Sequence, residues 1–289
     1  MEDINNISQK SNPRITVITA VLNRVGTLEK TIQSVLGQTY KNIEYIIIDG
    51  GSTDGTIDII KRYAPRISYW ISEKDKNIAD GMNKGITRAT GEYINFINSD
   101  DYFISNDLFE RIFSTPHSAD ILYGSFIGNF NGNSVACSMA SEKDVVGRAY
   151  QGMQLCHSAV FAKAAVLKKY KLDLGYRISP DNDFITKCVA NGHTFERLNE
   201  VIFMVGAQGT SFENWLPARI ENWKIARFYF PGIKTDWYHF YKLTHEVLFR
   251  AIKSVFSAVG LYQLARSFYR KKLQKKFPLL PGNIKPYNR

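Results

Sequence analysis

The sequence has little cysteine and no cysteine pair at metal-binding spacing. Its three cysteines, Cys137, Cys156 and Cys188, stand far apart in 289 residues, and no CxxC motif is present. This spacing argues against a structural zinc site and against a disulfide framework. It fits a reducing compartment.

Long apolar runs and nucleotide-loop motifs are also missing. No apolar stretch is long enough to span a bilayer, and the first thirteen residues are polar, unlike a signal peptide. We therefore expect a cytoplasmic protein, or a peripheral one on the inner face of the cell membrane. Neither GxGxxG nor GxxxxGK[ST] occurs, which argues against dinucleotide-binding and P-loop sites.

Acidic residues become scarce only toward the end of the chain. Residues 215–289 hold 15 Lys and Arg against three acidic residues, whereas residues 1–214 hold 22 basic and 24 acidic ones. The net charge of +10 therefore belongs to the C-terminal part. We expect a polar arm over 1–13, an α/β domain over 14–214 and a helical, basic region over 215–289.

Apolar, β-branched runs alternate with amphipathic segments through the first part of the chain. Strands are predicted over 14–22, 43–48, 67–71 and 93–97, and helices over 28–36, 56–63 and 78–89. This alternation predicts a Rossmann-like, mostly parallel sheet flanked by helices. Thr27 stands where it would cap the first helix.

The second part of the α/β region is less regular. We expect a helix over 107–113, a strand over 119–124, and a hairpin over 126–140 that turns at 131–133. The segment from about 125 to 215 would shape the pocket for an acceptor molecule.

Polar side chains follow the carboxyl ends of the predicted parallel strands. Asn23, Asp49, Asp75 and the pair Asp100-Asp101 all occupy such positions. Because ligands of doubly wound sheets bind beyond these ends, one crevice could collect the side chains.

The pair Asp100-Asp101 ends a buried strand. Adjacent carboxylates repel each other unless a cation or hydrogen-bond donors neutralise them, and Mg²⁺ or Mn²⁺ uses one or two carboxylates plus substrate phosphates. A metal–diphosphate clamp is one interpretation. An ordinary turn is the other, since Asn, Ser and Asp are common turn residues.

The loop that begins at Asp49 also allows two interpretations. Its glycines could bring backbone N–H groups close to a phosphate or a sugar, or simply form a strand-to-helix turn. For Gly51 and Gly55 we favour the turn. For Asp49 we favour ligand binding, because an unpaired carboxylate beside an apolar strand is costly.

Three further residues are candidates for acceptor chemistry. His157 lies among small and apolar residues, which fits a structural histidine or the wall of an acceptor pocket. Asp181 and Asp183 begin a predicted helix, where carboxylates are ordinary caps. A carboxylate beside bound substrate could instead serve as a general base.

These pieces together resemble the family 2 glycosyltransferases, which have a nucleotide-sugar-binding GT-A fold. The resemblance is carried, in family order and spacing, by residues 16–23, 38–40, 48–56, 79–85 and 91–101, and it extends over roughly 14–205. It is closest to bacterial enzymes that build capsules, O-antigens and exopolysaccharides. The resemblance implies an inverting, metal-dependent transferase that uses a nucleotide-diphosphate sugar, with a UDP-sugar favoured, and a lipid-linked or saccharide acceptor.

The resemblance also implies roles for individual residues. Asp101 and Asp100 would bind Mn²⁺ or Mg²⁺, Asp181 would be the catalytic base, and His157 and Asp183 would lie on the acceptor side. The nucleotide-sugar site would contain Ala20, Leu22, Asn23, Asp49, Gly51, Ser52, Asp75, Asp80, Asn83, Asn98, Ser99 and Asp100.

Three positions depart from the family pattern. Gly50 replaces a second Asp that often reads the base, Asn98 replaces a common Asp, and Pro180 replaces the usual Glu before the base. These departures keep open an alternative, a non-catalytic membrane-binding subunit with a degenerate sugar-nucleotide site.

The C-terminal region combines cationic and apolar residues at helical spacing. Such a segment can lie on an anionic membrane surface, or it can pack on the main domain with a solvated basic face. We favour the membrane. Nucleic-acid binding is a third hypothesis, but no recognised nucleic-acid-binding motif is present and we expect no such partner.

Overall fold

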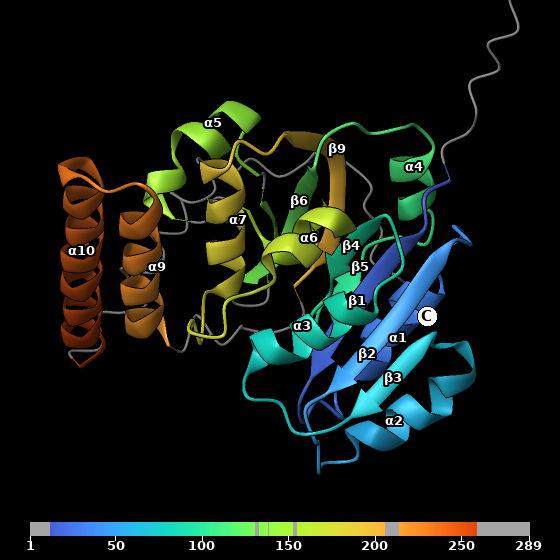
Figure 1. Cartoon of the computed structure of the whole chain (residues 1–289). Helices are drawn as coiled ribbons and strands as arrows, with labels where there is room; N and C mark the ends of the chain where they lie inside the picture. The colour runs from blue at the N-terminus through green and yellow to red at the C-terminus, as the bar shows by residue number, and fades with distance from the viewer. Residues whose placement is uncertain (1–11, 131–132, 138, 153–154, 206–213, 259–289) are drawn as a thin grey trace, which may run out of the picture.

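The computed structural model describes residues 12–130, 133–137, 139–152, 155–205 and 214–258 (Figure 1). The predicted polar arm, except its last two residues, and the basic segment 259–289 lie outside the described residues.

Within the described residues, nine strands form one mixed sheet. The strands, in chain order, are β1 (Ile15–Val21), β2 (Ile43–Asp49), β3 (Tyr69–Ser72), β4 (Tyr93–Phe96), β5 (Tyr102–Phe103), β6 (Ile121–Phe130), β7 (Asn133–Cys137), β8 (Val160–Lys163) and β9 (Phe195–Met204). Their order across the sheet is β3-β2-β1-β4-β8-β6-β9-β5, and β7 pairs with β6.

The sheet has a parallel part and a mixed part. β3, β2, β1 and β4 are mutually parallel neighbours, as the strand–helix alternation predicts. β8 then runs antiparallel to both β4 and β6, while β9 is parallel to β6. The α/β fold class is confirmed, and the parallel part brings the loops after β1, β2 and β4 to one edge of the sheet.

Helices cover both faces of the sheet (Figure 1). The helices that precede the C-terminal pair are α1 (Leu28–Leu36), α2 (Thr56–Tyr63), α3 (Ile78–Arg88), α4 (Leu108–Phe113), α5 (Glu142–Gly147), α6 (Ala164–Tyr170) and α7 (Pro180–Ala190), with short 3₁₀ turns η1 (Ala64–Arg66), η2 (Ala149–Gln151) and η3 (His157–Ala159). Buried residues of α1, α2 and α4 share one apolar cluster, and those of α3, α6 and α7 share another. Alternate residues of β1 enter the two clusters, as the two-residue period of a strand requires.

Close helix–strand packing explains one glycine of the sequence. A Cβ atom on Gly85 in α3 would lie 2.5 Å from Ile18 Cγ2 of β1. Glycine therefore lets α3 approach the sheet directly behind the predicted ligand edge.

One local prediction needs correction. Thr27 occupies the N-cap position of α1, but its side chain makes no capping hydrogen bond and its hydroxyl is buried without a partner in the described structure. The strand before the acidic pair ends one residue earlier than predicted. β4 ends at Phe96, and Tyr102 and Phe103 form β5, which pairs with β9 at the far edge of the sheet.

Two C-terminal helices complete the described chain. They are α9 (Trp215–Tyr229) and α10 (Ile233–Ala258). Figure 1 shows them side by side next to α7, and contacts between α9 and both α7 and α10 agree with this view. The helical prediction for this region is confirmed up to residue 258.

Candidate active site

The loop after β2 holds Asp49 through its own polar groups. The Asp49 carboxylate is fully buried and accepts hydrogen bonds from the N–H groups of Gly51 and Ser52, at 3.1 and 2.9 Å, and from both the Ser52 and Ser72 hydroxyls. The argument that an unpaired charge here needs a ligand is therefore wrong, because the loop and β3 already pair it. A nucleotide-binding role for Asp49 stays a prediction.

The residues after β1 join this loop from the neighbouring strand. Asn23, in a left-handed conformation (φ 51°), donates its N–H to Ser52 Oγ, and its Oδ1 accepts from the Thr53 N–H. Leu22 is 54% exposed at the same edge, whereas Ala20 is buried below it. The two strand ends thus form one surface, as predicted.

Asp75 lies on the other side of the same loop. Its Oδ1 is 2.6 Å from Lys84 Nζ, and Lys84 also pairs with Glu73 at 2.7 Å. A Cβ atom at Gly50 would lie 3.1 Å from Asp75 Oδ2, so the glycine leaves that space to the Asp75 carboxylate. Burial raises the pKa of Asp75, and Lys84 partly opposes this.

Two predicted nucleotide-sugar residues make intramolecular contacts instead of facing an open crevice. The Asn83 amide bonds both backbone groups of Leu172, at 2.8 and 2.9 Å. Asp80 accepts from the Lys76 N–H at the start of α3. These contacts favour structural roles, and any contact with a donor stays a prediction.

The segment 98–101 follows β4 and contacts α1, where the Thr31 hydroxyl donates to the Asp101 carbonyl oxygen at 2.7 Å. Asp101 is 4% exposed; its Oδ2 accepts from Asn98 Nδ2 and from Ser158 Oγ, each at 3.0 Å. Ser99 is buried beside it. Burial raises the pKa of Asp100, and the positive charge of Arg24 partly offsets the rise.

Asp181 reaches the site from α7 and meets His157 of η3. His157 Nδ1 lies 2.8 Å from Asp181 Oδ2, and His157 Nε2 lies 3.1 Å from Asn98 Oδ1. The second Asp181 oxygen accepts from the Asn182 N–H at 2.8 Å. The predicted base is therefore joined to the predicted metal motif.

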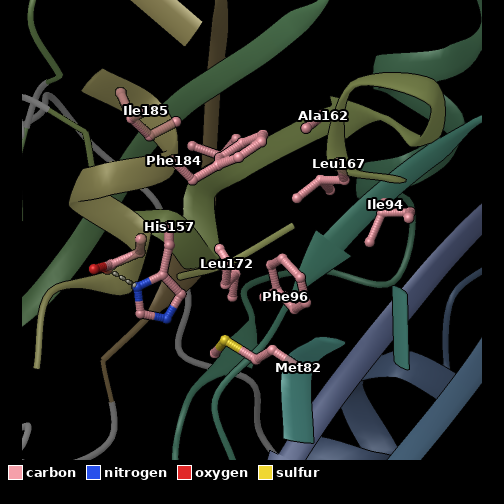
Figure 2. A pocket seen from close by; sticks show the side chains of 11 residues that line it. Met82, Ile94, Phe96, His157, Ala162, Leu167, Leu172, Phe184 and Ile185 are labelled. Atoms are coloured by element: carbon pink, nitrogen blue, oxygen red, sulfur yellow. Dashed lines mark hydrogen bonds and ion pairs between the residues drawn. The ribbon is translucent and has the colours of Figure 1, made fainter. Parts of the chain in front are cut away.

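An apolar pocket lies on one side of this contact. Figure 2 shows His157 beside Met82, Phe96 and Leu172, with a dashed line from its ring to a carboxylate, which is that of Asp181. The remaining walls are formed by Ile94, Val160, Ala162, Leu167, Phe184 and Ile185. His157 and Asp181 thus supply the polar groups of an otherwise apolar wall.

Asp183 does not line the pocket beside His157 and Asp181. It is 2% exposed, accepts a hydrogen bond from the Tyr229 hydroxyl of α9 at 3.0 Å, and pairs with Lys187 at 3.1 Å. Its position favours a structural role that joins α7 to α9.

Sequence reasoning overlooked Ser158 and Glu221. Ser158 donates to Asp101, and its place directly after His157 was the available signal. Both Glu221 carboxylate oxygens accept from backbone N–H groups of residues 177–179, at 2.9 to 3.0 Å, just before α7. Its signal was that only three acidic residues occur in the basic C-terminal region.

The residues present fit a hard divalent cation. Asp100 and Asp101 offer adjacent carboxylates, and burial of Asp100 leaves a charge that a cation would offset. Within the described residues, no cluster of three or more His, Cys, Asp or Glu side chains could hold a metal by itself. Such an ion would therefore take other ligands from substrate phosphates and water.

Comparison with solved structures defines the class of fold. The structure of S. aureus TarS residues 1–349 in complex with UDP-GlcNAc matches with a TM-score of 0.61 at 17% identity, over 75% of this chain and 65% of that one. The mannosyltransferase PcManGT from Pyrobaculum calidifontis, with GDP-Man and Mn²⁺, matches with a TM-score of 0.58 at 14% identity, over 89% and 83%. This chain spans only 38% of the longer TarS chain. At these identities the matches show the fold alone, which is the GT-A fold.

Sequence comparison points to one family. Residues 16–136 match the family model for Glycosyl transferase family 2. A PGL/p-HBAD biosynthesis glycosyltransferase of Mycobacterium bovis is 28% identical over 197 residues, 66% of this chain and 75% of that protein. The putative glycosyltransferase EpsE of Bacillus subtilis is 28% identical over 212 residues, 70% and 76%.

Proposed function

We propose that this protein is an inverting glycosyltransferase that moves a sugar from a nucleotide-diphosphate sugar, a UDP-sugar, to a lipid-linked or saccharide acceptor in polysaccharide synthesis. The observation that carries the proposal is the hydrogen-bonded link between Asp181 and the Asp100-Asp101 turn, at the carboxyl edge of the sheet. A base and a diphosphate-side carboxylate must both lie close to the sugar for a single displacement.

The loops after β1 and β2 form the donor side of this site. The nucleotide would lie over Asn23, Gly51 and Ser52, where the edge is open beside the exposed Leu22. The matching TarS and PcManGT structures bind UDP-GlcNAc and GDP-Man, respectively, which supports a nucleotide sugar as donor. Among these donors we propose a UDP-sugar.

Asp181 would act on the acceptor. Its carboxylate takes the proton of the acceptor hydroxyl while that oxygen attacks the anomeric carbon from the face opposite the diphosphate. The new carbon–oxygen bond forms as the bond to the diphosphate breaks, so the anomeric configuration inverts. One carboxylate base is sufficient for this reaction, unlike the paired carboxylates of retaining hydrolases.

Asp101 and Asp100 would hold Mn²⁺ or Mg²⁺. When bound, such an ion offsets negative charge on the diphosphate leaving group. Asn98 and Ser158 hold the Asp101 carboxylate in place, so its orientation does not depend on the ligand.

A lipid-linked acceptor would require contact with the inner face of the cell membrane, and α10 offers a suitable surface. Six of its exposed apolar side chains share one helix face, and we call them the α10 stripe: Ile233, Trp237, Tyr241, Leu248, Ile252 and Val255. Exposed Lys224, Arg227 and Lys234 lie nearby in the chain, and the sequence beyond residue 258 adds eight further basic residues and no acidic one. No described helix is long and apolar enough to cross a bilayer. We propose that α10 lies along the membrane surface with its stripe facing the lipid.

The transfer reaction is tested with radiolabelled UDP-sugars, Mn²⁺ and a bacterial lipid extract as acceptor source. We expect a labelled lipid product whose new bond has the anomeric configuration opposite to that of the donor, and no product with Asp181→Asn. Wild-type protein that binds a donor yet transfers nothing to any acceptor would favour the non-catalytic subunit instead.

The membrane contact is tested by co-sedimentation with phosphatidylglycerol vesicles. We expect wild-type protein to sediment and a Trp237→Ser, Leu248→Ser double variant to sediment at least tenfold less, because both side chains are exposed on the α10 stripe. The control is Val146→Ser, because Val146 is an exposed apolar residue outside α10. A buried residue such as Phe203 would be unsuitable. Equal sedimentation of all three proteins would contradict the membrane contact.

A further inference from the structure

The hydrogen-bond pattern around His157 fixes where its protons lie. Asp101 and Asp181, when ionised, can only accept hydrogen bonds. Asn98 places one end of its amide on Asp101 Oδ2, at 3.0 Å, and that end must therefore be the NH₂ group. The other end, Asn98 Oδ1, then faces His157 Nε2 at 3.1 Å and can only accept, so Nε2 must carry a proton.

The same reasoning applies to the second ring nitrogen. His157 Nδ1 lies 2.8 Å from Asp181 Oδ2, a distance typical of a charge-assisted hydrogen bond. An ionised Asp181 can only accept, so Nδ1 must carry a proton as well. With an ionised Asp181, both contacts are satisfied together only by a doubly protonated imidazolium.

Building on the proposed function, we propose that His157 is a positioning residue: as an imidazolium it orients the Asp181 carboxylate and, through Asn98, connects it to Asp101. The chain of contacts runs Asp181, His157, Asn98, Asp101 and Ser158. The base and the diphosphate-side carboxylate are thus held in one fixed relation before any substrate binds.

The neighbouring backbone and charges support this assignment. Asn95 of β4 donates to the carbonyls of Ser158 and Val160, at 3.0 and 2.8 Å, which anchors η3 to the sheet. The charged groups that face His157 within the described residues are Asp181 of α7 and Asp100 and Asp101 of the turn after β4.

Burial and charge act on His157 in opposite directions. Burial alone disfavours the charged ring, but the Asp181 hydrogen bond and the three carboxylates outweigh it, so the pKa of His157 is raised from its usual 6.5. The neighbouring Cys156 thiol has a raised pKa, chiefly through burial, and stays neutral over the same range.

Asn98 has a property that an aspartate would lack at this position. Its amide donates to one carboxylate and accepts from the imidazolium, whereas an aspartate would place two carboxylates 3 Å apart. The departure from the family pattern at residue 98 is therefore explained by the contact with Asp101.

The protonation state is measured first, because that experiment needs no substrate. We would record the ¹⁵N chemical shifts of the histidine rings at pH 6.5 and assign His157 by its loss in His157→Gln. We expect a ring that is mostly protonated on both nitrogens, because its pKa is raised above this value. A neutral ring at this pH would overturn the proposal whether or not sugar transfer is found.

The positioning role is measured with three variants. For His157→Gln, which keeps one donor, and His157→Phe, which keeps the ring volume but no donor, we expect kcat to fall about tenfold and about 100-fold. Donor affinity should change less than threefold in both. His193→Gln is the matched control, because His193 pairs with Asp120 at 2.8 Å outside the site and bonds a tyrosine hydroxyl, which can donate or accept.

The pH profile separates positioning from mere support of the fold. Wild-type kcat should decline as the pH rises and His157 loses a proton, because only the doubly protonated ring donates to both Asp181 and Asn98. The decline should persist in His193→Gln and disappear in His157→Gln. A decline of equal midpoint in His157→Gln would overturn the proposal, and absence of transfer by wild-type protein with a confirmed imidazolium would instead count against the proposed function.

Discussion

Asp49 and Asp181 are both carboxylates of the proposed site, but they are held in different ways. Asp49 is fully buried, and its partners are residues 51 and 52 of its own loop and Ser72 of the adjoining strand. Asp181 is 19% exposed, and its side-chain partner His157 comes from a different element 24 residues earlier. The Asp49 carboxylate is thus held largely by backbone and hydroxyl groups of its own loop, whereas the side-chain partner of Asp181 is a single histidine from another element.

The C-terminal helices extend this difference. Glu221 of α9 accepts from three consecutive backbone N–H groups before α7, so the segment that carries Asp181 depends on a helix forty residues further on. The C-terminal region can therefore pack on the main domain through one helix and still offer the other helix for contact with a membrane. α9 packs on α7, while α10 leaves its stripe exposed.

The largest effect is expected on kcat when Asp181, the proposed base, is replaced. Asp181→Asn should lower kcat by about 10²- to 10⁴-fold, because the amide cannot accept the proton of the acceptor hydroxyl. Its melting temperature is compared with that of Asp58→Asn, an exposed aspartate of α2, so that loss of the His157 contact is separated from loss of the base. Activity within threefold of wild type would remove Asp181 from the mechanism.

A smaller effect, on the free energy of unfolding, is expected for Ser52 in the loop after β2. Ser52→Ala removes the hydroxyl that donates to Asp49 and accepts from the Asn23 N–H at 2.8 Å. We expect the free energy of unfolding, from urea titration, to fall by about 1.5–3 kcal/mol. Exposed Ser118→Ala should change it little, and equal values for both variants would show that the loop does not hold Asp49.

Loss of Glu221 should affect both stability and rate. Glu221→Ala removes the acceptor of the N–H groups of residues 177–179. Because Glu221 is only partly buried, water can replace the carboxylate, and we expect the free energy of unfolding to fall by about 1–2 kcal/mol. The melting temperature should fall by a few degrees, and kcat should fall more than the affinity for donor. Exposed Lys224→Ala on the same helix is the control; a loss of stability with unchanged kcat would separate α9 from the acceptor side.

The smallest effect is expected at low pH and concerns the contribution of Glu44, in β2, to stability. Burial alone would raise the pKa of Glu44, but hydrogen bonds from Thr16 and Thr90 and the charge of Arg14 outweigh it and lower the pKa below 4.5. Its contribution to stability is therefore present above pH 4.5 and is lost as pH falls through the lowered value. The excess stability of wild type over Glu44→Gln, from urea titrations between pH 7 and 3, should shrink below pH 4.5; a constant excess would contradict this.

The sequence predicted the part of the site that local patterns encode. Strand periodicity and the residues after each strand correctly placed Asn23, Asp49 and Asp100-Asp101 at one edge of the sheet. The contact of His157 with Asp181 depends on β8 running antiparallel between β4 and β6, which no local pattern specifies. Asp183 shows the same limit, since the helical pattern fixed its place in α7 but not its contact with Tyr229 of α9.

The central claim, a nucleotide-sugar site with a metal-binding carboxylate pair, is tested most directly by thermal shift. Wild-type, Asp101→Asn and Asp181→Asn proteins would be heated with a panel of nucleoside diphosphates and nucleotide sugars, with and without Mn²⁺. Ligands that bind the folded state raise its melting temperature. We predict an Mn²⁺-dependent rise with UDP-sugars that Asp181→Asn keeps and Asp101→Asn loses; no rise with any nucleotide, from well-folded wild-type protein, would contradict the account.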